Sequence, residues 1–95
     1  MANWLGGYRV IANHTRTTSG TSAQTSAFNA NVEYVRVTTT GPVFIEFGAN
    51  PTAVVATSIY MAGDESITFK VDGGMKMATI HGSGTPSVYV AELSE

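Results

Sequence analysis

Few residues of this sequence carry side chains suited to acid–base, nucleophilic or metal chemistry, and they are scattered. The chain has 2 histidines, 7 Asp and Glu residues and no cysteine. His14 lies in a threonine-rich segment and His81 at the end of a predicted strand. Catalysis requires a nucleophile with a base, or two acid–base groups within reach of each other, and two isolated histidines do not form that pattern. The sequence therefore predicts no catalytic residue and a protein that is not an enzyme.

The acidic residues do not form a metal site either. Asp64, Glu65 and Asp72 stand at predicted turns, where Asp is favoured because its side chain bonds the backbone two residues on. The sequence has no HxH, HExxH or calcium-loop spacing, and Asp64 with Glu65 alone offers too few oxygen ligands. The Gly82-Ser83-Gly84 loop has no helix after it and no lysine beside it, so it is no phosphate cradle. We expect neither a metal nor a cofactor.

Composition limits the classes of partner. The chain has 95 residues, a net charge of −2 and 13% charged residues, which predicts one domain with one modest core. A net negative chain has no broad cationic field for phosphates, which argues against nucleic acid. No apolar run approaches a membrane span and no secretory signal is present, so we expect no membrane partner and a protein made in the cytoplasm. Hydroxyl-rich residues must cover much of the surface, and hydroxyls cost less to desolvate than ions, which suits contact with another protein.

The elements that must position these residues are β-strands. Apolar residues alternate with polar ones, as in Val43, Ile45 and Phe47, which is the period of a half-buried strand. The run 53–61 has a helical alternative, but its β-branched residues favour a strand. Two turns, Thr40-Gly41-Pro42 and Asp72-Gly73-Gly74, predict hairpins that pair each strand with the next. The predicted strands are 8–12, 24–28, 32–39, 42–47, 53–61, 65–71, 75–81 and 87–93.

Strands that follow one another every eight to twelve residues, separated by Gly and Pro, indicate an all-β sandwich or barrel with antiparallel sheets. Ahead of them, residues 1–7 form a glycine-rich stem that we expect to be an extended N-terminal arm. Residues 13–31 are rich in Thr and Ser and form either a long loop or weak edge strands. We therefore expect a single domain made of an arm segment, 1–31, and a sandwich core, 32–95.

Candidate interface residues fall into two groups. Large side chains of the arm segment and its surroundings could anchor a partner, because buried aromatic residues often anchor interfaces; Trp4 could instead cap the domain's own core. The second group is made of aromatic side chains that lie opposite the core face of their strands, where they would mark a protein interface. If the register of a strand is inverted, these side chains belong to the core instead. Arg9, Arg16 and Arg36 are expected to pair with Glu33 or Glu46 across strands. The candidates are Trp4, Leu5, Tyr8, Phe28, Arg36, Phe44, Tyr60 and Tyr89.

The stretches VEYVRVTTTGPVFIEFGANPTA and YMAGDESITFKVDGGMKMATIHGSGTPSVYVAEL carry a resemblance that covers residues 32–93. They resemble the small β-rich virion proteins of tailed bacteriophages, especially capsid decoration (cement) proteins. The resemblance implies a jelly-roll or sandwich domain, often a homotrimer, on the capsid surface. There it would hold neighbouring major capsid protein subunits together without catalysing a reaction. The resemblance fixes no binding residues, so the eight candidates rest on the residue patterns alone.

Two alternatives remain open. A phage head–tail connector or tail-tube component would also be a small β protein that assembles, but into rings. A carbohydrate-binding β-sandwich module would use an exposed Trp or Tyr to stack on sugars. The position of Trp4 in a glycine-flanked stem argues against a preformed sugar platform there.

Overall fold

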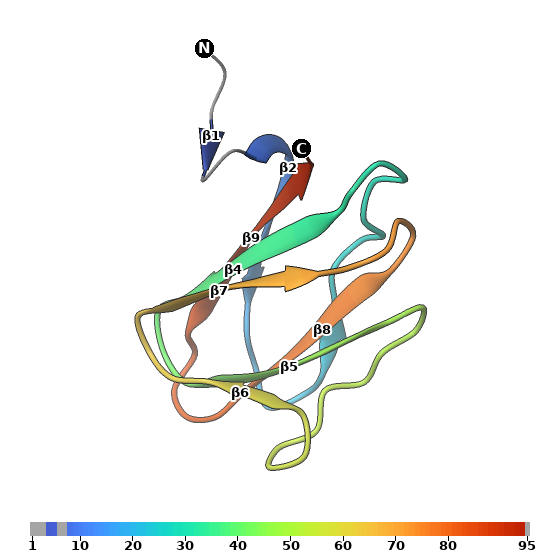
Figure 1. Cartoon of the computed structure of the whole chain (residues 1–95). Coiled ribbons are helices and arrows are strands. Elements are labelled where there is room, and N and C mark those ends of the chain that lie inside the picture. The colour runs from blue at the N-terminus through green and yellow to red at the C-terminus, as the bar shows by residue number, and fades with distance from the viewer. Residues whose placement is uncertain (1–3, 6–7, 95) are drawn as a thin grey trace.

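The computed structural model describes residues 4–5 and 8–94, with side chains from Arg9 onward. Within this part of the chain all regular structure is β-strand, and no helix is long and apolar enough to cross a membrane. Two antiparallel sheets lie face to face, as Figure 1 shows. The predicted all-β sandwich is confirmed. The strands are β1 (Trp4–Leu5), β2 (Tyr8–Thr17), β3 (Ala23–Gln24), β4 (Tyr34–Thr39), β5 (Val43–Gly48), β6 (Ile59–Met61), β7 (Glu65–Lys70), β8 (Lys76–His81) and β9 (Ser87–Ser94).

The strand order is that of a jelly roll. One sheet has five strands in the order β1-β2-β9-β4-β7, and the other has four in the order β3-β8-β5-β6. The chain doubles back between β5 and β6, and each earlier strand pairs with its later counterpart: β2 with β9, β3 with β8, β4 with β7 and β5 with β6. The four antiparallel pairs form one long two-stranded ribbon. This ribbon folds over itself, so that β2, β3, β4 and β5 lie alternately in the five-stranded and the four-stranded sheet. The jelly-roll expectation is thereby confirmed.

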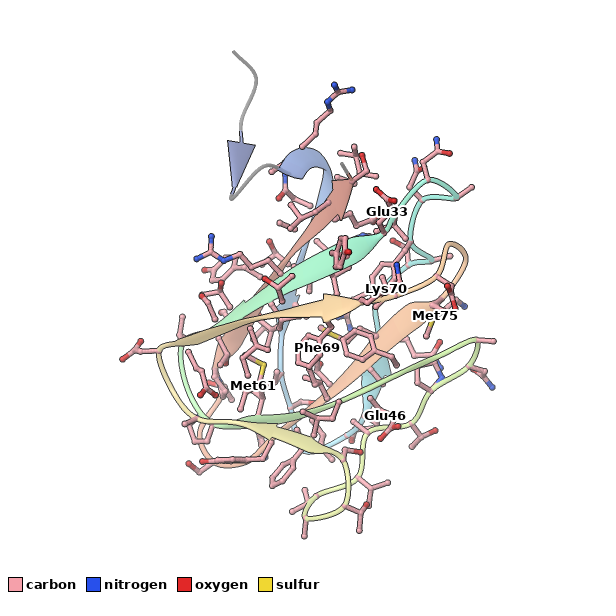
Figure 2. All side chains as sticks on the ribbon, viewed as in Figure 1. Glu33, Glu46, Met61, Phe69, Lys70 and Met75 are labelled. Atoms are coloured by element: carbon pink, nitrogen blue, oxygen red, sulfur yellow. The ribbon has the colours of Figure 1, made fainter. Side chains whose placement is uncertain are left out.

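The core lies between the sheets and follows the period-two pattern. Val43 and Ile45 on β5 are fully buried, and Phe47 packs against the same cluster. Val88 and Val90 on β9 are buried on either side of the exposed Tyr89. Figure 2 shows Met61 and Phe69 pointing into the space between the sheets. The predicted core face of β5 is therefore correct, and Tyr89 lies opposite the core face of β9, as predicted.

Both predicted hairpins are wrong. β4 pairs with β7 and β9 in one sheet, whereas β5 pairs with β6 and β8 in the other. Likewise β7 and β8 lie in different sheets, so the Asp72–Gly74 turn carries the chain across the sandwich. The physical reason is that an alternating strand buries one face whichever strand it pairs with, so alternation does not specify the partner. At the first crossing the Thr39 hydroxyl donates to the Gly41 carbonyl oxygen over 2.6 Å and accepts the Gly41 N–H.

The strand predicted over residues 53–61 is also wrong in its first part, since only β6 is extended there. Residues 55–57 form a turn, and Ala56 has a φ of 73°. Packing and side-chain bonds override local propensity in this loop. Ala53 is 3% exposed, and the Gln24 amide nitrogen donates to the Pro51 carbonyl oxygen over 2.9 Å.

The threonine-rich segment contributes to both sheets. β2 continues to Thr17 beside β9, five residues beyond the predicted end at residue 12. β3 is a short edge strand of the four-stranded sheet, which agrees with the edge-strand alternative. Of the predicted arm, the described part is β1, which pairs antiparallel with β2. Residues 8–31 thus belong to the sandwich rather than standing apart from it.

Candidate interaction surfaces

The outer face of the four-stranded sheet carries an aromatic pair. Phe44 on β5 and Tyr60 on β6 occupy directly opposite positions, and their ring centroids lie 5.1 Å apart. Tyr60 is 55% exposed, whereas Val43 and Ile45, which flank Phe44, are fully buried. The register is therefore as predicted, and the alternative of an inverted strand does not hold for β5. The pair presents a large apolar group to solvent.

The loop that leads into β6 extends this apolar surface. Val54, Val55 and Ile59 are 48%, 50% and 41% exposed. Figure 1 shows this loop projecting from the end of the sandwich near β6. Val54, Val55, Ile59 and Tyr60 are what we call the 54–60 patch, in which Tyr60 lies on the outer face of β6 and Ile59 on the opposite face. The sequence pattern missed the two valines because residues 53–61 were predicted to form a regular strand, whereas residues 55–57 form a turn.

Ser58 holds the loop that presents the patch. Its hydroxyl donates to the Glu46 carboxylate over 2.8 Å and accepts the Val54 N–H over 2.9 Å. The Ser58 N–H in turn donates to the Val54 carbonyl oxygen over 3.0 Å. Two exposed valines are therefore kept in a fixed turn that also contains the left-handed Ala56.

Replacing Ser58 with alanine is expected to lower the free energy of unfolding by about 1–2 kcal/mol, because two hydrogen bonds are lost and one of them involves a carboxylate. Chemical denaturation measures this change, and amide hydrogen exchange of residues 53–58 should show faster local opening. Thr57→Ala is the control, since that exposed side chain has no hydrogen bond in the described part of the chain. Equal effects of the two substitutions would contradict the role given to Ser58.

The outer face of the five-stranded sheet carries an open groove of about 290 Å³. The strand register places its side chains in two rows across β2, β9 and β4. One row contains Thr15, Tyr89 and Thr38, and the next contains Asn13, Ala91 and Arg36. The small side chain of Ala91 lies between two longer ones, which creates the hollow. We call this feature the sheet groove.

The Arg36 guanidinium in this groove has no hydrogen bond or ion pair to any other described residue. The predicted pairing with Glu46 is wrong, because Glu46 lies in the other sheet and accepts the Ser58 hydroxyl. Lys70 is the other cation on this face, and its ammonium lies 5.0 Å from the centroid of the Tyr34 ring. Arg36 therefore presents a positive charge to whatever enters the groove.

His14 and Glu92 form a buried pair on the inner side of the same sheet. Nε2 of His14 bonds one carboxylate oxygen of Glu92, and the other oxygen accepts the Asn29 N–H over 2.7 Å. The His14 and Glu92 side chains are 14% and 2% exposed. The His14 ring also contacts the Phe28 ring edge-on, with centroids 5.7 Å apart. This network ties the segment after β3 to strands β2 and β9.

Ser26 adds a hydroxyl to this network, so Ser26, His14 and Glu92 follow the order of a nucleophile, base and acid. The Ser26 Oγ to His14 Nδ1 distance is 3.4 Å, outside the reach of about 2.6–3.2 Å of an activated nucleophile. The sheet groove opens on the opposite face of the sheet, away from Ser26. The arrangement is accounted for by its structural role, which is to close one end of the core.

The described residues show no group of three His, Asp or Glu side chains placed to hold a metal ion. His81, the second histidine, has its Nδ1 buried without a hydrogen-bond partner among those residues. It lies at the end of β8, where its backbone N–H donates to the Ser19 carbonyl oxygen over 3.0 Å. Nothing in these positions builds a metal centre.

The structure sorts the predicted interface residues into distinct places. Arg36 and Tyr89 line the sheet groove, whereas Phe44 and Tyr60 lie on the other sheet. Phe28 is 3% exposed and belongs to the core, which leaves its ring no free surface for a partner. The side chains of three further candidates lie outside the described residues: Trp4, Leu5 and Tyr8.

Comparison with known proteins bears on the fold. No protein-family model matches the chain, and no curated protein does. A solved structure that is similar is a de novo designed double-stranded β-helix, with a TM-score of 0.57, 16% identity, and coverage of 88% of this chain and 100% of that one. A protein from Bacillus endospore appendages, described as a family of disulfide-linked pili, gives a TM-score of 0.49 at 22% identity over 87% of this chain and 85% of that one. The first similarity supports the double-stranded, jelly-roll arrangement of the strands.

Proposed function

We propose that this chain is a non-enzymatic virion structural protein of a tailed bacteriophage, which binds the exterior of the assembled capsid. It stabilises the shell by holding neighbouring major capsid protein subunits together. The observation that carries the proposal is the 54–60 patch, four exposed apolar side chains on β6 and on the loop before it, which Ser58 fixes. The capsid as the partner rests on the resemblance of residues 32–93 to decoration proteins.

The patch has the composition of a protein-binding surface. Val54, Val55, Ile59 and Tyr60 are all between 41% and 55% exposed, and none is charged. Burying such side chains against a partner is favourable by about 25 cal/mol for each Å² of apolar surface removed from water. The loop is already held in one conformation, so binding costs less conformational entropy. The aromatic Tyr60 backed by Phe44 is the anchor expected of such a surface.

Repetition would convert this modest surface into a strong attachment. A capsid presents the same site many times on a rigid lattice, and a homotrimer would present three patches at once. The second and third contacts are then intramolecular, which raises total affinity without new interactions. A ring-forming connector or tail-tube component is the competing assembly, and it would use the same kind of surface with a different symmetry.

Co-sedimentation with empty shells of the phage that encodes the chain tests the proposal. Tyr60→Ala and Val55→Ser are expected to lower binding at least about tenfold each, as substitutions at an interface anchor do. Tyr89→Ala is the matched control, because Tyr89 is 48% exposed but lies on the other sheet. Light scattering of the free protein reports the oligomer. Binding that is unchanged in both patch variants, or rings in place of trimers, would contradict the proposal.

A further inference from the structure

The sheet groove is a second site, separate from the patch. It lies on the outer face of the five-stranded sheet, whereas the patch lies on the loop and edge strand of the four-stranded sheet. Its walls come from three neighbouring strands that are hydrogen-bonded along their length, β2, β9 and β4. A site built on paired strands holds its side chains in fixed relative positions. The groove is therefore preformed.

The side chains in the groove combine three kinds of contact. Tyr89 offers a half-exposed aromatic ring. Asn13, Thr15 and Thr38 supply an amide and two hydroxyls on the two sides of that ring, with Thr38 Oγ1 already bonded to Ser66 Oγ over 2.7 Å. Arg36 supplies an unpaired guanidinium one row away from Tyr89. These groups suit a ligand with a flat apolar face, several hydroxyls and one negative charge.

The charged side chains on the outer face around the groove are all positive. The register places Tyr34, Arg36 and Thr38 of β4 opposite Lys70, Thr68 and Ser66 of β7 on this outer face. The outward positions Asn13 and Thr15 of β2 and Tyr89 and Ala91 of β9 complete the surface. Within these outward positions the charged residues are Arg36 and Lys70, although the whole chain has a net charge of −2. The local field therefore favours an anion.

We propose that the sheet groove binds an acidic sugar residue of the uronic-acid type. The apolar face of the pyranose ring lies against Tyr89, the carboxylate pairs with Arg36, and ring hydroxyls bond to Asn13, Thr15 and Thr38. Guanidinium and carboxylate match in geometry and can form two parallel hydrogen bonds. A volume of about 290 Å³ is at the lower end for ligand pockets, which suits a single ring.

A sugar fits better than the other anions. A nucleic-acid strand would need a continuous basic track for its phosphates, and the groove offers a single guanidinium beside a cation already engaged with Tyr34. An acidic peptide would place a flexible chain over a flat sheet whose central strands have no free backbone groups to pair with. A sugar ring needs only a stacking surface and hydroxyl partners. The inference does not rest on the capsid proposal.

The experiment is an NMR titration of the ¹⁵N-labelled full chain with the methyl glycoside of galacturonic acid, which carries a free carboxylate. The uncharged match is the methyl ester of the same glycoside. We expect shifts confined to residues 13–15, 36–38 and 89–91, with the ester binding about tenfold more weakly because the Arg36 pair is lost. Tyr89→Ala should weaken binding of the acid at least tenfold, and Arg36→Gln should reduce it to the level of the ester.

Tyr60→Ala, a matched exposed tyrosine on the other sheet, should bind the sugar as the unaltered chain does. Tyr89→Phe keeps the stacking ring and should retain most of the affinity, which guards against a Tyr89→Ala variant that fails to fold. The proposal is overturned if the acid and its ester bind equally, if shifts fall outside the groove, or if a mononucleotide binds more tightly than the sugar. Loss of shell binding in Tyr60→Ala with intact sugar binding would separate the two sites.

Discussion

Replacing Glu92 with alanine is expected to lower the free energy of unfolding by about 3–5 kcal/mol, which for a domain of this size is a large part of the total. The carboxylate is 2% exposed and accepts from both His14 and the Asn29 N–H. Its removal leaves the largely buried His14 ring and the part-buried Asn29 N–H without an acceptor, and it opens a cavity where strands β2 and β9 meet. Urea denaturation measures the loss.

Glu92→Gln is the control for shape. It keeps an acceptor oxygen for one of the two donors, so it should cost about 1–2 kcal/mol. A double-mutant cycle tests the coupling of the pair. Replacing both His14 and Glu92 with alanine should lower the free energy of unfolding by less than the sum of the two single changes, because each single change leaves the other residue without its partner. Strict additivity, or a loss in Glu92→Ala below that of Glu92→Gln, would show that the network does not stabilise the core end.

Replacing Gly73 with alanine is expected to cost about 3 kcal/mol of the free energy of unfolding. A Cβ atom at this position would lie 2.6 Å from the Ala30 carbonyl oxygen and 2.8 Å from the Ala30 Cα. Both contacts are with backbone, so no side-chain rotation relieves them. The crossing from β7 to β8 must move away from the segment before β4. Thermal and chemical denaturation both report the effect.

The neighbouring glycine provides a sharp comparison. Gly74 has a φ of +85°, but a Cβ there meets nothing within 4 Å. Its replacement by alanine should cost about 1 kcal/mol through backbone strain alone. If backbone conformation alone decided the loss in free energy of unfolding, the alanine substitution at Gly74 would cost more than the one at Gly73. A larger loss at Gly74 than at Gly73 would mean that the two segments do not pass as closely as the structure has them.

The sequence was sufficient for the core faces and insufficient for the strand partners. Alternation in Val43, Ile45 and Phe47 reports which face is apolar, and that face is the buried one in the structure. Whether β5 follows β4 into the same sheet depends on how the whole ribbon folds over, which local patterns do not record. Turn residues such as Gly73 mark a reversal or a crossing equally well. In the structure this turn passes against Ala30, which is distant in sequence.

The candidate sites show the same limit. Tyr60 and Tyr89 could be identified from their position opposite the core face. The groove around Tyr89 requires the alignment of Asn13, Ala91 and Arg36 on three strands, and that alignment follows from register. Glu92 continues the inward alternation of Val88 and Val90, yet a carboxylate there is understandable only with His14, 78 residues away, as its partner. Long-range polar partners have no local signal.

The pairing of early strands with late ones also imposes an order of assembly. Val43 and Met61 of β5 and β6 can meet once the middle of the chain exists, whereas Arg9 has its partner at Ser94. The closing of so long a loop makes the outermost pairing slow relative to the innermost one. During synthesis β2 leaves the ribosome long before β9, which carries the Glu92 carboxylate that binds His14. We therefore expect the pairing to proceed from the β5–β6 ribbon outward, with β2 among the last strands to be fixed.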